Sequence, residues 1–319
     1  KSQLISIIAH ARSGATDRAW SLFREAGLER VEDDPAVLSV RGRLLKDRAQ
    51  SASGAEQRSL YLDAAAVYLK AGELSAGTYP LINAATLYLL AGDRARAAEL
   101  AEAIWKQIED DPSEPETPYY LGATRSEALL IMGKVEEARS ELGSAIALAP
   151  LAWEDHASTL RQFEKLLEAQ EADAGWLDEL RPPRSLHFAG HMAVSGSDPE
   201  IAGRLDAFIA QGKIGFGYGA LAAGADILIA EALVRAGAEL HVVLPFPRDV
   251  FVRLSVAPAG AEWVERFDAL MEQASSVREL MSDAPPAHPA AIALADAIAM
   301  GGAAMNACQL QSYSDRKST

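Results

Sequence analysis

Residues 185–196 read SLHFAGHMAVSG, and residues 214–246 read IGFGYGALAAGADILIAEALVRAGAELHVVLPF. The segment 225–236 has apolar residues at helical spacing, and Gly237 stands after it where a helix C-cap would lie. Short apolar runs bounded by Gly or Pro, as in buried parallel strands, occur at 185–189, 214–216 and 240–246. The alternation of strand, glycine loop and helix predicts an α/β domain with a parallel sheet.

Glycine-rich loops follow the first two predicted strands, and we expect them at one edge of the sheet, where open α/β folds bind ligands. Glycines let backbone amides approach an anion, and a helix N-terminus adds partial positive charge, so we expect these loops to suit a phosphate ligand. His191 either donates to a phosphate or sugar oxygen or caps a loop. Asp226 either contributes to the pocket or caps its own helix. The candidate ligand-binding residues in these loops are Gly190, His191, Gly217, Gly219, Ala220, Gly224 and Asp226.

Two common nucleotide motifs are absent from this region. The strand at 240–246 does not end in the acidic residue that a dinucleotide-binding fold uses, and no Gly-Lys-Ser/Thr follows the glycines. These absences exclude dehydrogenase-type and P-loop sites here. Arg248, just beyond the third strand, is the cation best placed to meet a phosphate.

The composition of the chain argues against several classes of function. The formal charge of −15 argues against binding nucleic acid or an anionic membrane surface, because either needs a net basic face. A single cysteine, Cys308, excludes disulfides within the chain and cysteine-rich metal sites, and we expect it to be a buried small residue. No apolar run is expected to reach the ~20 residues of a membrane span. These features predict a cytoplasmic protein with no metal site.

Residues 4–180 show helical periodicity throughout, with short Gly, Asp or Pro breaks. The segments 88–105, YLLAGDRARAAELAEAIW, and 129–150, LLIMGKVEEARSELGSAIALAP, each place a Gly turn between two helices, and the second helix is rich in small residues. This pattern resembles the tetratricopeptide repeat, in which helical pairs of ~34 residues stack on one another. Residues 77–92 also resemble the TRAFs-binding domain of signalling proteins. The resemblance implies a concave face that holds a peptide or a second domain.

The boundary between the two patterns lies near 181–184, where two prolines stop the preceding helix. We therefore expect a helical-repeat domain at 1–181 and a Rossmann-like domain at 182–319, the latter incomplete at its C-terminal end. Further along, 277–280 is a candidate fourth strand, 290–310 reads as an alanine-rich helix, and 308–313 is a candidate lead into a fifth strand.

Four segments of the second half together resemble the SLOG superfamily: FAGHM at 188–192, GALAAGADILIAEAL at 219–233, HVVLPF at 241–246 and GAEWVERFDALMEQASSV at 260–277. That superfamily includes the Lonely Guy phosphoribohydrolases, the DNA-processing protein A group and bacterial sensor domains. The resemblance implies a nucleotide-type pocket shaped by Gly190, His191, Gly219, Gly224 and Asp226. Lonely Guy enzymes carry PGGxGT before a catalytic glutamate, whereas 257–262 reads APAGAE here, which leaves Glu262 as a weak catalytic candidate.

The sequence thus favours a bacterial signalling protein over an enzyme. Its SLOG-like domain would bind a nucleotide-derived ligand, and its helical repeats would engage a protein partner or relay the bound state to an effector. One alternative is a phosphoribohydrolase of the Lonely Guy type, which would cleave an N-glycosidic bond in a nucleotide. The other is a helical-repeat scaffold whose Rossmann-like domain binds nothing. No cofactor other than the nucleotide-type ligand is implied, and homo-oligomer formation stays open.

Overall fold

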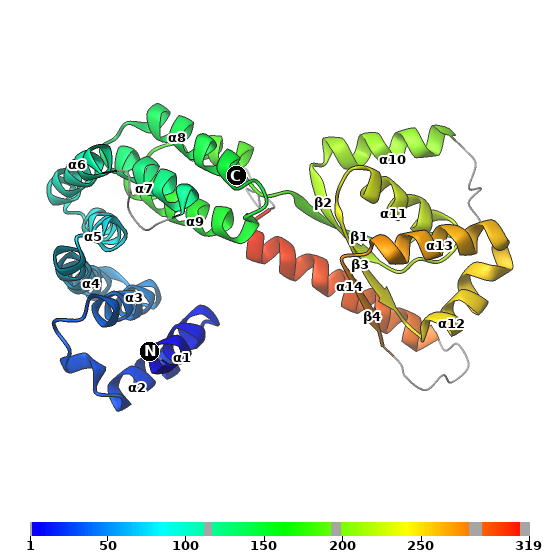
Figure 1. Ribbon diagram of the computed structural model, residues 1–319, viewed down its shortest axis with the longest axis horizontal. Coiled ribbons are helices and arrows are strands. Elements are labelled where there is room, and N and C mark those ends of the chain that lie inside the picture. Colours follow the sequence, from blue (N-terminus) through cyan, green and yellow to red (C-terminus); the bar gives the residue numbers. More distant parts are fainter. Residues whose placement is uncertain (1, 112–116, 193–198, 281–288, 313–319) are drawn as a thin grey trace. The chain divides into compact units, whose positions relative to one another are not determined.

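The computed structural model describes residues 2–111, 117–192, 199–280 and 289–312 (Figure 1). The chain divides into two compact units, Lys1–Leu180 and Arg181–Thr319. The break falls at the proline-containing segment Arg181-Pro182-Pro183, where a helix cannot continue.

The first unit is helical throughout its described residues. Its α-helices are α1 Ser2–Arg12, α2 Thr16–Glu25, α3 Pro35–Ser51, α4 Gly54–Ser75, α5 Thr78–Leu90, α6 Arg94–Asp110, α7 Pro118–Ile131, α8 Val135–Leu148 and α9 Trp153–Ala169. Short 3-10 turns occur at Leu28–Arg30 and Gly175–Glu179.

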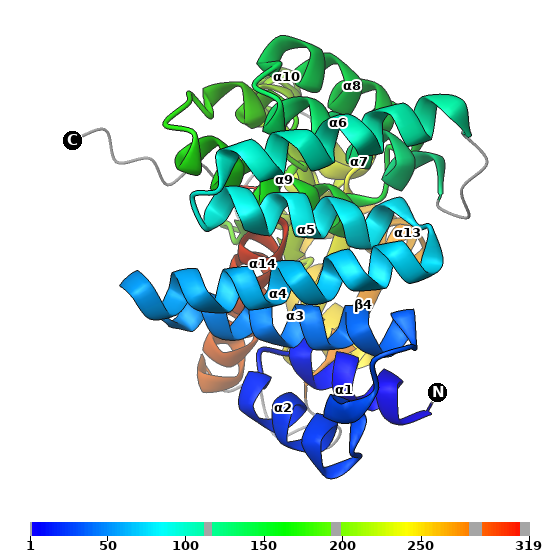
Figure 2. The same ribbon diagram turned by 90° about the vertical axis from the view of Figure 1, so that its left-hand side faces the viewer.

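Consecutive helices pack in antiparallel pairs because glycines close the turns between them. Gly92 and Gly133, with φ of +82° and +79°, stand between α5 and α6 and between α7 and α8, in a conformation that favours glycine. Ala97 and Ala101 are fully buried, so α6 lies close against α5. Figure 2 shows α3, α4, α5 and α6 stacked in chain order. The predicted tetratricopeptide-like architecture is confirmed.

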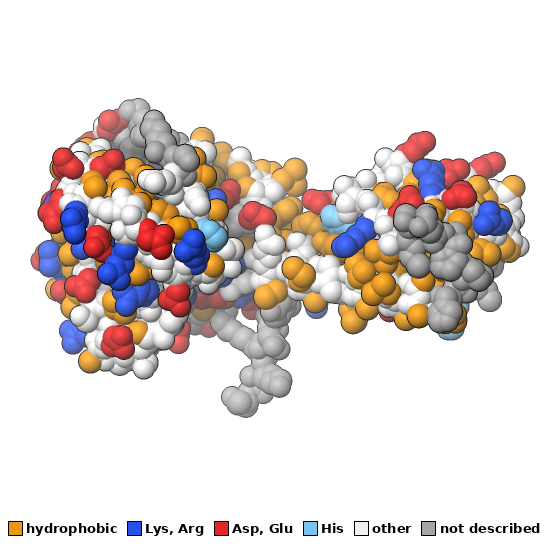
Figure 3. Space-filling model, turned by 90° about the horizontal axis from the view of Figure 1, so that it is seen from below, with side chains coloured by type: hydrophobic (Ala, Val, Ile, Leu, Met, Phe, Trp, Pro, Cys, Tyr) orange, Lys and Arg blue, Asp and Glu red, His pale blue; other side chains and the backbone are white. Residues whose placement is uncertain are grey.

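Alternate helices of the stack also touch. α5 contacts α7 and α9, and α7 contacts α9. These odd-numbered helices therefore form one layer of the stack. Acidic and basic side chains intermingle on the face of the helical unit shown in Figure 3.

The second unit is built on a parallel sheet. Its strands are β1 Arg184–Phe188, β2 Ile214–Gly219, β3 Glu239–Leu244 and β4 Ser276–Glu279, and its helices are α10 Pro199–Gln211, α11 Ala225–Arg235, α12 Arg248–Phe251, α13 Ala261–Gln273 and α14 Pro289–Leu310. Between α12 and α13 lie a π-helical turn, Val252–Val256, and a 3-10 turn, Ala257–Ala259. The strand order is β1-β2-β3-β4, with every pair parallel. The predicted α/β fold class and the fourth strand are confirmed.

The two faces of the sheet have different partners. In Figure 1, α10, α11 and α13 lie on one face and α14 on the other. The first face is strongly apolar, and its strand residues form one core with α11 and α13: Phe188, Leu240, Val242 and Leu244. On the second face, Ala295 and Ala299 of α14 pack on Val243.

The structure corrects two expectations about the C-terminal region. Helix α14 continues through Leu310, so Cys308 lies in a helix rather than at the start of a fifth strand. Cys308 is exposed, not buried. Among the described residues, α14 is the one helix long and apolar enough to cross a membrane, a criterion that helices of soluble proteins also meet.

Candidate functional site

The predicted loops meet at the carboxyl edge of the sheet. Phe188, at the end of β1, pairs in register with Gly219, at the end of β2. Gly190 and His191 follow β1 directly, and α11 begins at Ala225, a few residues after β2. The parallel register therefore brings together segments that lie more than thirty residues apart in the chain.

Asp226 connects these loops. Its Oδ1 accepts a hydrogen bond from the backbone N–H of Gly190 at 2.7 Å, and its Oδ2 accepts one from the N–H of Ala222 at 3.3 Å. The residue is only 6% exposed. Burial raises the pKa of Asp226 from its ordinary value of 3.8 to about 6, although the two amide bonds act in the opposite direction. Asp226 is thus a buried bridge between two loops, and the cap position of α11 belongs to Gly224.

The glycines of this edge are sites of close packing. A Cβ on Gly190 would collide with the Cβ of Ala225, and one on Gly219 would lie 2.6 Å from the carbonyl oxygen of Phe188. Gly224 has φ of +97°, and a Cβ there would lie 2.6 Å from the carbonyl oxygen of His191. These glycines are required because loop, strand and helix approach closely there.

Close packing also accounts for Gly217, which lies on β2 two residues before Gly219. Gly217 faces Leu233 of α11, whose side chain fills the space that a Cβ would need. Ala220, by contrast, lies half-buried in the loop after β2. In the segment 217–224, Gly217 is therefore needed for the packing of α11 on the sheet, and Gly224 is needed for the tight loop before α11.

His191 has a different environment. Its backbone carbonyl accepts a hydrogen bond from the N–H of Ala225 at 3.1 Å, which fixes the loop against the start of α11. The residue itself is exposed at the carboxyl edge. Of the predicted ligand-binding residues in these two loops, His191 is the one whose side chain is most available to solvent.

Two further residues act on this region, and the sequence analysis did not identify them. The Nε2 of His187 on β1 lies 2.9 Å from Oδ1 of Asp296 on α14. Both groups act electrostatically on Asp226, whose pKa is raised by Asp296 and lowered by His187. Asp296 is the single charged residue of the helix PAAIALADAIAMGGAAMNACQL. A lone charge in an apolar helix is the sequence feature that could have identified it.

Arg248 is engaged elsewhere. Its guanidinium Nη2 lies 2.7 Å from Oδ1 of Asp268 on α13, and its backbone N–H donates to Oε2 of Glu279 on β4 at 3.2 Å. With Asp249 and apolar neighbours, these residues line a separate open cavity of about 570 Å³. The contacts of Arg248 thus run to α13 and β4.

Glu262, the weak catalytic candidate, lies exposed in the first turn of α13. The pKa of Arg266 is raised mainly by a hydrogen bond to Glu231, and the charge of Glu262 raises it further. Arg266 and Glu231 form a bidentate pair with both N···O distances at 2.7 Å, which joins α13 to α11. Glu262 therefore belongs to the surroundings of a structural ion pair.

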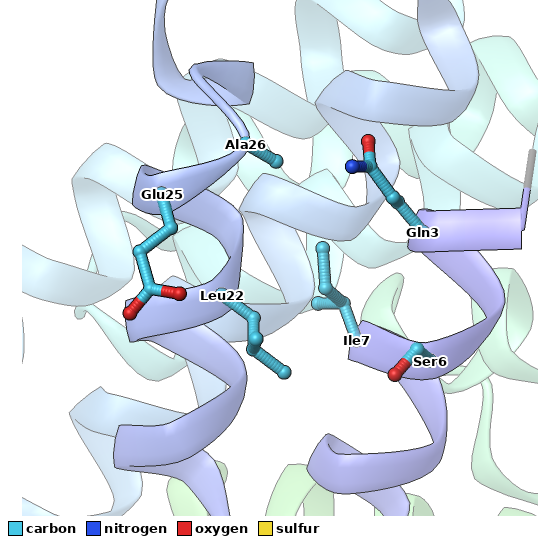
Figure 4. Close-up of a pocket in the computed structure, with 6 residues that line it drawn as sticks. All are labelled: Gln3, Ser6, Ile7, Leu22, Glu25 and Ala26. Carbon is cyan, nitrogen blue, oxygen red and sulfur yellow. The ribbon is translucent and has the colours of Figure 1, made fainter.

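A cavity of about 190 Å³ lies between α1 and α2 (Figure 4). Its lining consists of Gln3, Ser6, Ile7, Leu22, Glu25 and Ala26. The one ionisable group there, Glu25, forms an exposed ion pair with Arg18 at 3.8 Å. This lining resembles a packing crevice between two helices more than a site for chemistry.

Comparison with known families gives a match over part of the chain. Residues 2–88 match the family described as Tetratricopeptide Repeats-Sensor, a range that covers α1 to α4 and most of α5. No curated protein and no solved structure matches the chain. The match supports the helical-repeat assignment of the first unit, in agreement with its observed stack of helices.

Proposed function

We propose that this chain is a cytoplasmic signalling protein. Its Rossmann-like unit binds a nucleotide-derived ligand at the carboxyl edge of β1 and β2, and its helical repeats bind a protein partner. The description of the matched family as a sensor supports the signalling role. Stacked helical repeats present extended surfaces suited to protein recognition, which supports the second part.

The bridge made by Asp226 is the observation that carries the ligand proposal. It ties the loop after β1 to the loop after β2 beside the start of α11, at the edge where parallel sheets bind ligands. The exposed His191 offers a side-chain donor, and the N-terminus of α11 adds partial positive charge. The resemblance to the SLOG superfamily makes a nucleotide the expected class of ligand.

Such a ligand has a route to the rest of the unit. Movement of the loop after β1 alters the surroundings of Asp226, and His187 and Asp296 lie in the same electrostatic environment. Because Asp296 belongs to α14, a ligand at the loops would act electrostatically on that helix. The ligand changes this equilibrium only if it binds one arrangement more tightly than the other.

A scaffold without a ligand is the second candidate function, and the glycines favour it. Their close contacts with Ala225, Leu233 and Phe188 give each of them a structural reason to be glycine. The strand order β1-β2-β3-β4 also does not reverse within the described sheet, and ligand crevices of open α/β folds form where the order reverses.

Nucleotide binding distinguishes these functions. The full chain is titrated with AMP, ADP, ADP-ribose, NAD and cyclic AMP, and thermal unfolding is recorded, because a ligand of the folded state raises the melting temperature. We expect one nucleotide to raise it and His191→Ala to remove most of that rise. Arg204→Ala, a change of an exposed cation on α10, is the matched control and should keep the rise. If no nucleotide has an effect, the scaffold function is favoured.

A further inference from the structure

A second cavity, of about 210 Å³, lies within the helical unit. Residues from α3, α5, α7 and α9 line it together with Tyr68 of α4. Each of these four helices contributes polar residues at helical spacing: Arg43, Lys46 and Asp47 from α3, Tyr79 and Asn83 from α5, Tyr120, Thr124 and Glu127 from α7, and Ser158, Thr159 and Gln162 from α9. Four polar stripes on separate helices therefore face one space.

The interior of this cavity holds ionisable groups that are costly to bury. Nζ of Lys46 donates to Oδ1 of Asn83 at 3.1 Å. Glu127 accepts hydrogen bonds from Thr86 and from Nε2 of Gln162, the latter at 2.9 Å. Burial lowers the pKa of Lys46 and raises the pKa of Glu127, since each charged form loses hydration. An apolar repeat core would avoid this cost, so the polar lining needs a reason.

Two buried atoms of the lining have no hydrogen-bond partner among the described residues. These are Nε of Arg43, a donor, and Oδ2 of Asp47, an acceptor. They lie 3.8 Å apart, which is too long for a hydrogen bond between them. Buried polar atoms are normally paired, so this pair marks a position for a ligand atom or an ordered water molecule.

The charges around the cavity favour an anion of low charge. Arg43, Lys46 and the neighbouring Lys165 are basic, whereas Asp47 and Glu127 are acidic, and Asp155 accepts a hydrogen bond from the lining Tyr120. Burial raises the pKa of Asp47 and of Glu127, which favours their uncharged forms and lessens their repulsion of an anion. A carboxylate with one charge costs less to bury beside these groups than a dianionic phosphate does.

We propose that this cavity binds a small molecule that carries one carboxylate, held by Arg43 and Lys46. The guanidinium supplies a directed donor, and the ammonium has donors beyond the one given to Asn83. The hydroxyl-bearing walls of Tyr79, Tyr120 and Thr159 suit a polar remainder. The site is independent of the sheet edge and of any nucleotide bound there.

The test uses matched probes on the full chain. Acetate, lactate and N-acetylglycine represent small monocarboxylates, N-acetylglycinamide has the shape of the last without its charge, and inorganic phosphate represents the dianion. Binding is followed at millimolar concentration by NMR of amides in α3 and α7. We expect at least one monocarboxylate to shift these signals, and N-acetylglycinamide and phosphate to leave them unchanged.

Variants locate the binding. Arg43→Gln and Lys46→Gln should each weaken binding at least about tenfold, the loss of one charge-assisted hydrogen bond. Arg58→Gln, a change of an exposed cation on α4, should leave affinity unchanged. An unaltered amide spectrum shows that each variant is folded. The proposal is overturned if no monocarboxylate binds, if phosphate binds more tightly, or if Arg43→Gln binds as well as the parent.

Discussion

The replacement Asp226→Asn tests whether the loop bridge is a buried carboxyl with a raised pKa. A rise from 3.8 to about 6 corresponds to roughly 3 kcal/mol of unfolding free energy, at about 1.4 kcal/mol per pKa unit. At 6% exposure, solvent screening does not reduce this figure much. Asparagine does not titrate, so the difference in stability between the two proteins isolates this group.

The raised pKa of Asp226 determines whether stability rises or falls with pH. Below about pH 3.8 Asp226 is protonated in both the folded and the unfolded chain. Between that value and about 6 the unfolded chain releases the proton while the folded chain keeps it, so the stabilising contribution is lost as pH rises through this window. The parent protein should therefore lose about 3 kcal/mol relative to Asp226→Asn between pH 3.5 and pH 7.

Urea unfolding of the full chain measures this difference, with the amide signals of Gly190 and Ala222 reporting the second unit. Asparagine has one acceptor oxygen and loses one of the two amide bonds, but this loss is constant with pH and cancels in the comparison. Asp206→Asn, which changes an exposed carboxylate paired with Arg235, is the control and should show little effect. A stability difference that stays flat from pH 3.5 to 7 would refute the reasoning.

Two further changes test packing and the contact of α14. Gly190→Ala should destabilise the second unit by about 1–3 kcal/mol, because its Cβ collides with that of Ala225, whereas Gly203→Ala in open space on α10 should be neutral or stabilising; equal midpoints in urea unfolding would contradict this. Asp296→Asn weakens the half-exposed contact with Nε2 of His187 and should cost no more than about 1 kcal/mol while speeding hydrogen exchange along α14. Unchanged exchange would show that the small residues alone hold that helix.

The repeat and sheet architecture could be predicted from the sequence because local rules decide it. Glycines such as Gly92 and Gly133 stand where only a positive φ closes the turn between helices. Apolar runs bounded by Gly or Pro became β1 to β3, and the segment at 277–280 became most of β4. The order of elements then left a parallel sheet as the natural arrangement.

The roles of individual site residues depended on tertiary structure. Sequence left Asp226 between pocket and helix cap, but its carboxylate reaches amides of two loops, one of them 36 positions away. Arg248 follows a strand toward the expected ligand edge, yet its contacts are with Asp268 and Glu279. Such outcomes depend on which neighbours lie within about 3 Å, and spacing along the chain does not contain that information.

The same reason explains the cavity in the repeats. Each polar stripe is visible in the sequence of its own helix, for example Arg43, Lys46 and Asp47 on α3, and each alone is typical of a solvated face. Only the stacking of α3, α5, α7 and α9 brings the stripes to one space and partly buries them. The sequence by itself determined the helices, the strands and their order, because these follow from local periodicity and turn residues. The packing of those elements decided which charges meet, because burial and pairing are properties of the assembled core.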